Sequence, residues 1–302
     1  MSKIPPYLKK GDTIGIVAPA GFMDLEKMQS CIDTLDTWGY NVELGKTTHS
    51  YSENYFSGTD EERLADLQAM LDNNNIKAIL CARGGYGMSR IIDKIDFRKF
   101  RKKPKWIIGF SDITVLHVHI HSKYSIASLH APMAAAFNDG AFTNPYIQSL
   151  KNTLEGEPAS YECAAHEYNH TGDAKGELIG GNLALLAHLV GTPSDINTKK
   201  RILFLEDIGE YIYNVDRMFI QLKRSGKLKK LAGLIIGGFT DSKDTERPFG
   251  KTVYEVIKEH VKEFKYPISF GFPVSHETEN YALKIGCRYK LKVDHDGTTL
   301  SE

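Results

Sequence analysis

The first half of the sequence alternates short apolar runs with amphipathic stretches, and this alternation constrains the fold more than any other feature. The apolar runs, which predict strands, are 13–19, 41–45, 76–82, 106–110 and 125–132. The amphipathic stretches, which predict helices, are 25–38, 60–71 and 112–121. Strands separated by helices pair in parallel and are covered on both faces. The sequence therefore predicts an α/β fold with functional residues at the carboxyl ends of its strands.

The second half also predicts an α/β unit, but with more antiparallel hairpins. Strands are expected at 201–207, at 231–239 and in short segments near the end, and helices at 213–224 and 253–264. Between the halves, residues 139–175 are rich in polar and turn residues, which predicts a helix followed by an interdomain connection. Because 302 residues suit two domains, we expect an N-terminal domain at 1–150, a linker at 151–173 and a smaller C-terminal domain at 174–302.

Charge and cysteine content argue against several classes of protein. Lys plus Arg and Asp plus Glu both number 38, so the chain lacks the basic excess that is typical of a nucleic-acid-binding protein, and no nucleic-acid partner is expected. The basic run RKFRKKPK at 98–105 is expected to be a solvated surface turn, with an anion-binding patch as its alternative. The four cysteines form no CxxC pair, which leaves zinc-ribbon and thioredoxin-like functions unsupported.

The N-terminal stretch shows neither the long apolar core of a signal peptide nor a segment long enough to span a bilayer. We therefore expect a cytoplasmic protein with no membrane partner and reduced thiols. A dinucleotide cofactor is not expected either, because a G-x-G-x-x-G pattern starting at Gly85 would need glycine where Arg90 stands.

Ser111 follows a predicted strand in the segment IIGFSDI and precedes a predicted helix. A serine on a tight turn between strand and helix has the geometry of a nucleophile elbow, where the helix N-terminus favours nearby negative charge. The second glycine of G-x-S-x-G is replaced by Ile113. The alternative is that Ser111 or Asp112 caps the helix.

The loop RGGYG at 83–87 also follows a strand directly. Gly84 and Gly85 allow a sharp turn and present backbone N–H groups that can hold an oxyanion. The guanidinium of Arg83 can pair with a substrate carboxylate, and a surface salt bridge is its alternative.

Carboxylates and histidines follow other predicted strands. Glu206 ends an apolar strand, where a carboxylate can orient a histidine, and an acidic helix start is the alternative. His276 lies in a loop after a strand. His130 ends a strand on the expected site face, where we expect it to bind substrate. In HVHIH at 117–121, His117 and His121 share a helix face, but no acidic partner follows at metal-site spacing, so no metal is expected.

Together these segments resemble the LD-carboxypeptidase family, serine peptidases typified by murein tetrapeptide carboxypeptidase. The resemblance runs nearly end to end and rests on several motifs in the same order. These are GDTIGIVAPAG (11–21), RGGYG (83–87), IGFSDIT (108–114), HAPM (130–133), GELIGGNLALL (176–186), FLEDIGEYIYNVDRM (204–218), GLIIGGF (233–239) and FPVSH (272–276). One departure is Ala131, where many relatives have glycine.

The resemblance implies a flavodoxin-like or amidotransferase-like N-terminal domain and a catalytic triad of Ser111, Glu206 and His276. It also implies an oxyanion hole built from the N–H groups of Asp112 and of Gly84 or Gly85, with no metal and no cofactor. The implied reaction removes the terminal D-alanine from a muropeptide tetrapeptide stem in peptidoglycan recycling, and family members are usually homodimers.

Two other functions remain open. The first is the microcin-immunity branch of the same family, whose members cleave peptidyl-nucleotide conjugates and should carry an aromatic platform for the base. Only Trp38 and Trp106 are present, and neither is in an obvious site loop. The second is a two-domain small-molecule binding protein without catalytic activity.

Overall fold

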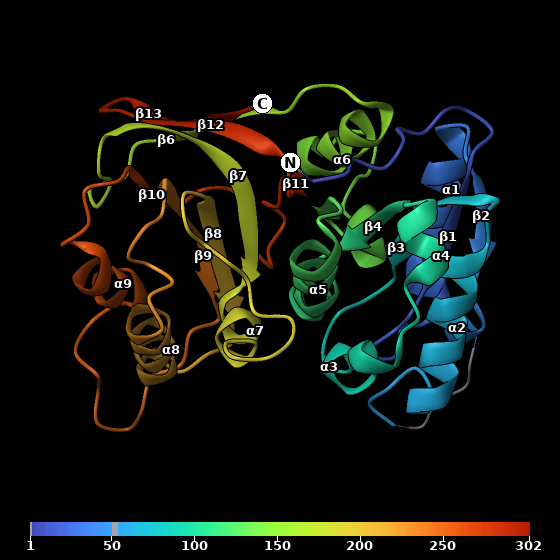
Figure 1. Ribbon diagram of the computed structural model, residues 1–302, viewed down its shortest axis with the longest axis horizontal. Coiled ribbons are helices and arrows are strands. Elements are labelled where there is room, and N and C mark those ends of the chain that lie inside the picture. Colours follow the sequence, from blue (N-terminus) through green and yellow to red (C-terminus); the bar gives the residue numbers. More distant parts are fainter. Residues whose placement is uncertain (1, 50–53) are drawn as a thin grey trace. The chain divides into compact units, whose positions relative to one another are not determined.

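The computed structural model describes residues 2–49 and 54–302, and these residues form two compact units. The N-terminal unit contains Ser2–Glu157 and a short return segment, Tyr281–Lys284. The C-terminal unit contains Pro158–Asn280 and Ile285–Glu302. Figure 1 shows that the red end of the chain contributes strands to both units.

The N-terminal unit is built on a six-stranded sheet with the order β11-β5-β4-β3-β1-β2. Its strands are β1 (Thr13–Val17), β2 (Asn41–Leu44), β3 (Ile76–Cys81), β4 (Trp106–Gly109), β5 (Ser128–His130) and β11 (Leu283–Ile285). The first five pair in parallel in the order 2-1-3-4-5, which is the flavodoxin-like arrangement and confirms the predicted fold class. All four residues of β4 are buried, as expected for a strand covered on both faces.

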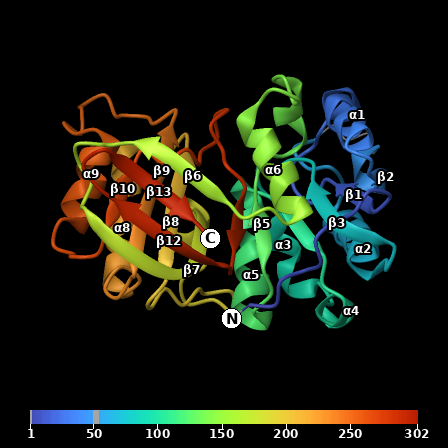
Figure 2. The ribbon, with the colours of Figure 1, turned by 90° about the horizontal axis from the view of Figure 1, so that it is seen from above.

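Helices cover both faces of this sheet. They are α1 (Gln29–Thr37), α2 (Asp60–Asp72), α3 (Met88–Ile91), α4 (Arg98–Lys102), α5 (Thr114–Tyr124) and α6 (Pro145–Glu155). Figure 2 shows α1 and α6 on one face and α2, α4 and α5 on the other. Helix α2 begins with three acidic residues, Asp60, Glu61 and Glu62, and Thr59 and Glu62 form a capping box there.

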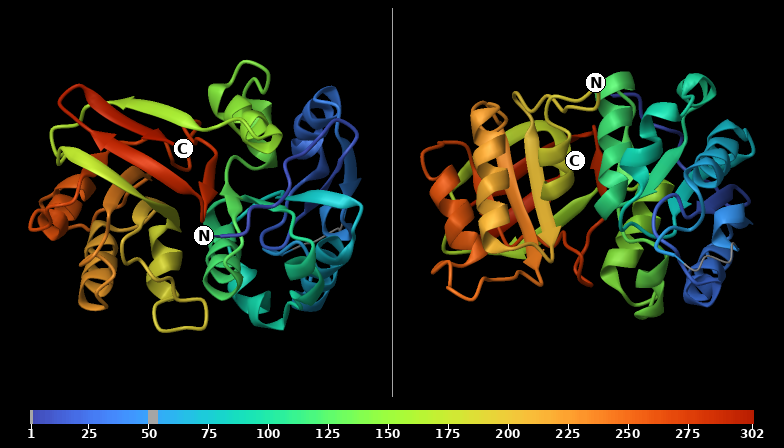
Figure 3. Two further views of the ribbon diagram at one scale, coloured as in Figure 1. Left: turned by 45° about the horizontal axis from the view of Figure 1, so that its top comes forward. Right: turned by 90° about the horizontal axis from the view of Figure 1, so that it is seen from below.

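The C-terminal unit has a seven-stranded sheet with the order β10-β9-β8-β7-β12-β13-β6. Its strands are β6 (Ser160–Ala164), β7 (Gly172–Asn182), β8 (Ile202–Ile208), β9 (Gly233–Thr240), β10 (Ile268–Phe270), β12 (Arg288–Val293) and β13 (Gly297–Ser301). Strands β7 to β10 are parallel, whereas β12, β13 and β6 are antiparallel, which confirms the expected antiparallel content. Figure 3 shows the antiparallel strands, in red and yellow-green, continuing the sheet beyond β7.

The parallel half of this sheet carries α7 (Leu183–His188), α8 (Ile212–Arg224) and α9 (Val253–Val261). Helix α8 contacts both of the others, so the three lie next to one another (Figure 1). Burial follows this layering. The residues of β8 are buried up to Asp207, whereas β12 alternates exposed and buried residues because only one of its faces is covered.

Two segments differ from the sequence expectation. The stretch 151–173, expected to be a linker, contains the last turns of α6 and all of β6. Strand β6 lies at the sheet edge and exposes alternate polar residues, which explains why its composition resembled a loop. One of the short strands expected near the end of the chain, β11 in the segment YALKIG (281–286), pairs at the edge of the N-terminal sheet and not within the C-terminal one.

No helix within residues 2–49 and 54–302 combines the length and apolar character needed to cross a membrane.

Candidate active site

Ser111 lies at the point where β4 ends and a short 3-10 helix, η4 (Ser111–Ile113), begins. Its backbone φ is +61°, a left-handed conformation that a non-glycine residue adopts at a cost. The N-cap position is Phe110, and no side chain caps this helix among the described residues. Ser111 is therefore the half-exposed apex of a strained turn rather than a helix cap.

The glycine loop after β3 packs directly against Ser111. A Cβ atom added to Gly84 would lie 2.9 Å from Cβ and 3.1 Å from Oγ of Ser111. The same position is 3.3 Å from the backbone nitrogen of Asp112. Only glycine fits there without displacing the serine turn, so the loop and the N–H of Asp112 converge beside the hydroxyl group.

Gly85 and Gly21 fix the course of this loop. Gly85 has a φ of +98°, and the carbonyl oxygen of Gly84 accepts a hydrogen bond from the N–H of Gly21 at 3.0 Å. Gly21 lies in the loop after β1, at the same end of the sheet. The loops that follow three neighbouring strands therefore meet at Ser111, because the carboxyl ends of parallel strands share one edge.

The carboxylate of Asp112 holds the next helix in place. Its Oδ2 accepts a hydrogen bond from the N–H of Met88, the first residue of α3, at 2.8 Å. No described residue donates to Oδ1. Burial raises the pKa of Asp112 to about 6, although the Met88 bond and the nearby Arg63 charge oppose this change.

Arg63 is a fully buried cation beneath these loops, and the sequence analysis did not identify it. Its Nη1 donates to the carbonyl oxygen of Pro19 at 2.7 Å, and its Nη2 pairs with Asp60. A Cβ atom on Gly87 would approach Nη1 to 2.6 Å. Arg63 thus supports the loops after β1 and β3 from below, and its only sequence signal is one arginine on a helix whose apolar face is buried.

Glu206 and His276 form a close pair in the C-terminal unit. The Nδ1–H of His276 donates to Oε2 of Glu206 at 2.6 Å, since a carboxylate only accepts. Glu206 is fully buried, and 11% of the His276 side chain is exposed. Burial lowers the pKa of His276, but the charge and hydrogen bond of Glu206, together with the charge of Asp207, outweigh burial and raise it above the ordinary value.

Two adjacent glycines of β9 allow the His276 loop to approach Glu206. A Cβ atom on Gly237 would lie 2.2 Å from the carbonyl oxygen of Val274, and one on Gly238 would lie 2.5 Å from Cβ of Ser275. The N–H of Gly238 donates to that Val274 oxygen at 2.9 Å. Sequence reasoning gave these glycines no individual role, since close backbone approach shows itself only in three dimensions.

Asp207 is a second buried carboxylate beside Glu206. It accepts hydrogen bonds from Nδ2 of Asn182 at 2.7 Å and from the N–H of Ala184 at 3.0 Å. Burial and the Glu206 charge raise its pKa to about 7. An acidic helix start is the alternative role that the sequence offers for this pair of carboxylates. Asp207 does bind the first turn of a helix, but that helix is α7, which begins at Leu183 and does not follow β8.

Arg83 and His130 occupy different environments. Arg83 is exposed and donates to the carbonyl oxygen of Phe22 at 2.8 Å. No carboxylate among the described residues forms an ion pair with it, so the salt-bridge alternative is not observed there. His130 is fully buried at the end of β5, with its ring 5.7 Å from that of Phe110.

The HVHIH segment forms part of α5, where His117 and His121 are buried. Nε2 of His117 donates to the carbonyl oxygen of Gly109 at 2.8 Å, which ties α5 to the end of β4. Burial lowers the pKa of His117 to about 4. Within the described residues, no group of three or more His, Cys, Asp or Glu side chains is arranged to hold a metal ion.

The structure thus brings together two groups of the predicted residues. Ser111, Asp112, Gly84 and Gly85 converge within the N-terminal unit, and Glu206 and His276 pair within the C-terminal unit. The first group offers a hydroxyl group beside backbone donors, and the second offers a buried carboxylate that orients an imidazole. These are the components of a nucleophile, an oxyanion site and a general base.

Two family models and a similar protein all identify this chain as related to carboxypeptidases. Residues 14–131 match the LD-carboxypeptidase N-terminal domain, and residues 175–291 match the LD-carboxypeptidase C-terminal domain. A probable murein peptide carboxypeptidase of Bacillus subtilis is 37% identical over 287 residues, which cover 94% of this chain and 90% of that protein.

Solved structures agree on the fold. The muramoyltetrapeptide carboxypeptidase of Oxalobacter formigenes superposes with a TM-score of 0.87 at 30% identity, covering 96% of this chain and 98% of that one. The microcin C7 self-immunity protein MccF, in complex with glutamyl sulfamoyl guanosine, has a TM-score of 0.88 at 22% identity, covering 99% and 98%. This second likeness concerns the fold alone. With both of its halves matched in order and a close relative spanning nearly its whole length, the chain belongs to the LD-carboxypeptidase family of serine carboxypeptidases.

Proposed function

We propose that this protein is a serine carboxypeptidase that releases the terminal D-alanine from muropeptide tetrapeptide stems. The observation that carries the proposal is the 2.6 Å hydrogen bond between the buried Glu206 carboxylate and His276. A buried carboxylate that orients an imidazole is the arrangement a general base needs. The relatives named as murein and muramoyltetrapeptide carboxypeptidases support this substrate class.

In the proposed mechanism, Ser111 Oγ attacks the scissile carbonyl carbon while Nε2 of His276 takes the hydroxyl proton. Glu206 keeps the other ring proton on Nδ1 and stabilises the imidazolium that forms. The same proton then passes to the departing amine of D-alanine. In the second half of the reaction, His276 takes a proton from water, the water attacks the acyl-enzyme, and the proton returns to Ser111 Oγ as the acyl group leaves. The mechanism requires Ser111 and His276 to come within hydrogen-bond reach during turnover.

The oxyanion is proposed to bind the N–H of Asp112 and an N–H of the loop at Gly84 and Gly85. The tight approach of Gly84 to Ser111 supports this assignment, because it places the glycine loop beside both the hydroxyl group and the N–H of Asp112. Each such donor typically lowers the barrier by about 3 kcal/mol.

The substrate ends in a carboxylate, so a cation should meet it. Arg83 is the candidate, since it is exposed and its recorded contact is with a backbone carbonyl group. His130, buried behind Phe110, is better placed to support the serine turn than to touch substrate. We also propose that the enzyme acts in the cytoplasm as a homodimer in peptidoglycan recycling, and light scattering during size-exclusion chromatography tests the dimer.

The microcin-immunity activity is the second candidate, because MccF shares the fold. A nucleotide base needs an accessible aromatic surface, but Trp38 is only 5% exposed and Trp106 is fully buried. Tyr86 of the RGGYG loop is 48% exposed and does offer such a surface. The relatives named as murein and muramoyltetrapeptide carboxypeptidases are what favour the muropeptide. A non-catalytic binding protein is the third candidate, and it gives no reason for a buried carboxylate to hold His276.

The deciding experiment is incubation with a tetrapeptide stem and detection of free D-alanine by mass spectrometry. A stem ending in L-alanine is the matched control, and glutamyl sulfamoyl guanosine, the compound bound to MccF, tests the second candidate. Stems with lysine or diaminopimelate at the third position define the specificity. Release from the D-alanine stem alone supports the proposal, whereas cleavage of the nucleoside conjugate alone selects the alternative.

Ser111→Ala separates catalysis from binding. This variant should still bind the stem but release no D-alanine. Unchanged turnover would remove Ser111 from the mechanism, and binding without turnover in the wild-type protein would favour the non-catalytic candidate.

A further inference from the structure

A pocket of about 550 Å³ lies at the amino ends of the strands of the N-terminal sheet. Its lining includes Asp12, which precedes β1, Asn74, which precedes β3, and Lys105, which precedes β4. Ser111 and the glycine loop lie at the opposite ends of these strands. Because strands of this length span about 15 to 20 Å, the pocket is separate from the candidate active site.

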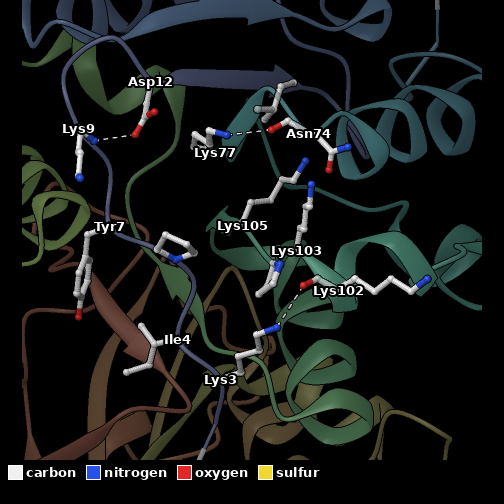
Figure 4. A pocket seen from close by; sticks show the side chains of 13 residues that line it. Lys3, Ile4, Tyr7, Lys9, Asp12, Asn74, Lys77, Lys102, Lys103 and Lys105 are labelled. Atoms are coloured by element: carbon white, nitrogen blue, oxygen red, sulfur yellow. Dashed lines mark hydrogen bonds between the residues drawn. The ribbon is translucent and has the colours of Figure 1, made fainter.

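Lysines dominate this pocket, which we call the lysine pocket. Its six lysines are Lys3, Lys9, Lys77, Lys102, Lys103 and Lys105. Among the described residues that line it, Asp12 is the only carboxylate, which leaves a formal charge of +5 (six minus one). Figure 4 shows the side chains of Lys103 and Lys105 extending towards Lys77, whereas that of Lys102 extends away from them. Among the described residues, none of the six lysines forms an ion pair.

Several of the ammonium groups are positioned by backbone carbonyl groups. Lys77 Nζ donates to the carbonyl oxygen of Asn74 at 3.0 Å, and Lys3 Nζ lies 3.4 Å from those of Arg101 and Lys102. A carbonyl group orients an ammonium group but does not neutralise it. The pocket therefore keeps its charge while several of its cations are held in place.

Lys105 is a buried cation of this pocket. Only 4% of it is exposed, and its Nζ donates to the carbonyl oxygens of Met70 and Asn73 at the end of α2. Burial, and next the repulsion of Lys77, lower the pKa of Lys105 to about 8. A ligand anion would relieve this repulsion.

The rest of the lining is largely apolar and includes Ile4, Pro6, Tyr7 and Pro104. A ligand that matches both the lysines and the apolar residues carries a concentrated negative charge and an organic portion. Phosphate groups fit best, because lysine binds phosphate as a point charge and a diphosphate places several charges within a short distance. A nucleic-acid polymer fits less well, since the net charge of the whole chain is zero and cannot attract one over a distance.

We propose that the lysine pocket binds a small organic diphosphate. The basic run at 98–105, expected from the sequence to be a solvated turn, supplies Lys102, Lys103 and Lys105 to it. Lys3 and Lys77, which are distant from this run in the sequence, line the same pocket. Their presence supports the alternative that the run is part of an anion-binding patch.

Isothermal titration calorimetry of the full chain tests this proposal with inorganic pyrophosphate, ADP and malonate as probes. The test variant is Lys77→Gln/Lys103→Gln, which spares Lys105 because that residue closes α2. The matched control is Lys262→Gln/Lys265→Gln, which removes two exposed lysines of the C-terminal unit.

We expect ADP to bind saturably, pyrophosphate to bind more weakly and malonate to bind at least tenfold more weakly than either. The pocket variant should lose at least tenfold in affinity for ADP, and the control should lose less than twofold. Raising the salt concentration from 50 to 200 mM should weaken binding in the wild-type protein more than in the pocket variant.

D-alanine release should be equal in the wild-type protein, the pocket variant and the control variant. Because the calorimetric test measures binding and not release, it stays valid even if the proposed peptidase function is wrong. The proposal is overturned by the absence of saturable binding, by malonate binding as tightly as pyrophosphate, or by an equal loss of affinity in the control variant.

Discussion

The Nδ1–H of His276 donates to Oε2 of Glu206 over 2.6 Å, and the accepting carboxylate has no exposure to solvent. This bond fixes the tautomer of the imidazole, because a neutral ring with its proton on Nδ1 accepts a proton only at Nε2. It also stabilises the charged ring in a buried place. The pair therefore has a chemical consequence that can be measured.

Glu206→Gln keeps the shape of the side chain and removes its charge. Under the proposed mechanism, kcat for D-alanine release should fall by about 10² to 10⁴, since the corresponding loss in other serine peptidases is near 10⁴. KM should change little. The measurement is steady-state kinetics on the tetrapeptide stem.

Asp207→Asn is the matched control, because Asp207 is also buried and adjacent but hydrogen-bonds to Asn182 and Ala184. Its effect on kcat should be less than tenfold. Equal losses in the two variants would show that general damage, and not orientation of His276, explains the result.

The pH dependence follows from the raised pKa of His276. The base must be neutral to accept a proton, so kcat/KM should decline on the acidic side with a midpoint above 6.5, the ordinary histidine pKa. In Glu206→Gln the raising influence is lost and burial remains, so the midpoint should move to lower pH. An acidic limb that does not move would exclude His276 as the titrating base.

Gly84→Ala tests the space beside Ser111. The added Cβ would lie 2.9 Å from Cβ of Ser111, closer than such atoms tolerate, so the serine turn or the loop must shift. We expect kcat to fall by about 10² to 10³, the cost of one oxyanion donor. The measurement is D-alanine release alongside the thermal midpoint of unfolding.

Gly250→Ala serves as the control for Gly84→Ala. An added Cβ there meets nothing within 4 Å, and its φ of +82° adds only strain of about 1 kcal/mol. It should lower stability slightly and leave kcat intact. If Gly84→Ala retained full activity, the loop would have no part in binding the oxyanion.

Asp112→Asn should stabilise the protein at neutral pH. The pKa of Asp112 is about 6 in the folded state and near 3.9 unfolded, so the folded state holds its proton longer and stability falls as pH rises from about 4 to 6. Asparagine keeps an acceptor for Met88 and avoids the buried charge. We expect a gain on the order of 2 kcal/mol at pH 7.5 and no gain at pH 4.

Urea unfolding at both pH values measures this difference. The exposed Asp139→Asn is the control and should show no such pH dependence. A gain for Asp112→Asn that is the same at pH 4 and pH 7.5 would contradict the buried-charge explanation.

The sequence by itself determined the α/β class, the parallel N-terminal sheet and the family, because periodic apolar runs and ordered motifs are local properties of the chain. It also predicted Ser111, Gly84 and Asp112 at strand ends, since a parallel sheet gathers those ends at one edge. The pairing of Glu206 with His276, 70 residues apart, was implied by the family resemblance rather than by any local pattern.

Only the tertiary structure decided which side chains meet. Arg63 beneath the loops, the approach of Val274 to Gly237, and the return of β11 to the N-terminal sheet leave no periodic signal. The lysine pocket likewise joins residues from three separate stretches of chain, 3–12, 74–77 and 102–105. Close packing and charge are properties of distances in space, and the chain sets those distances only once its sheets have formed.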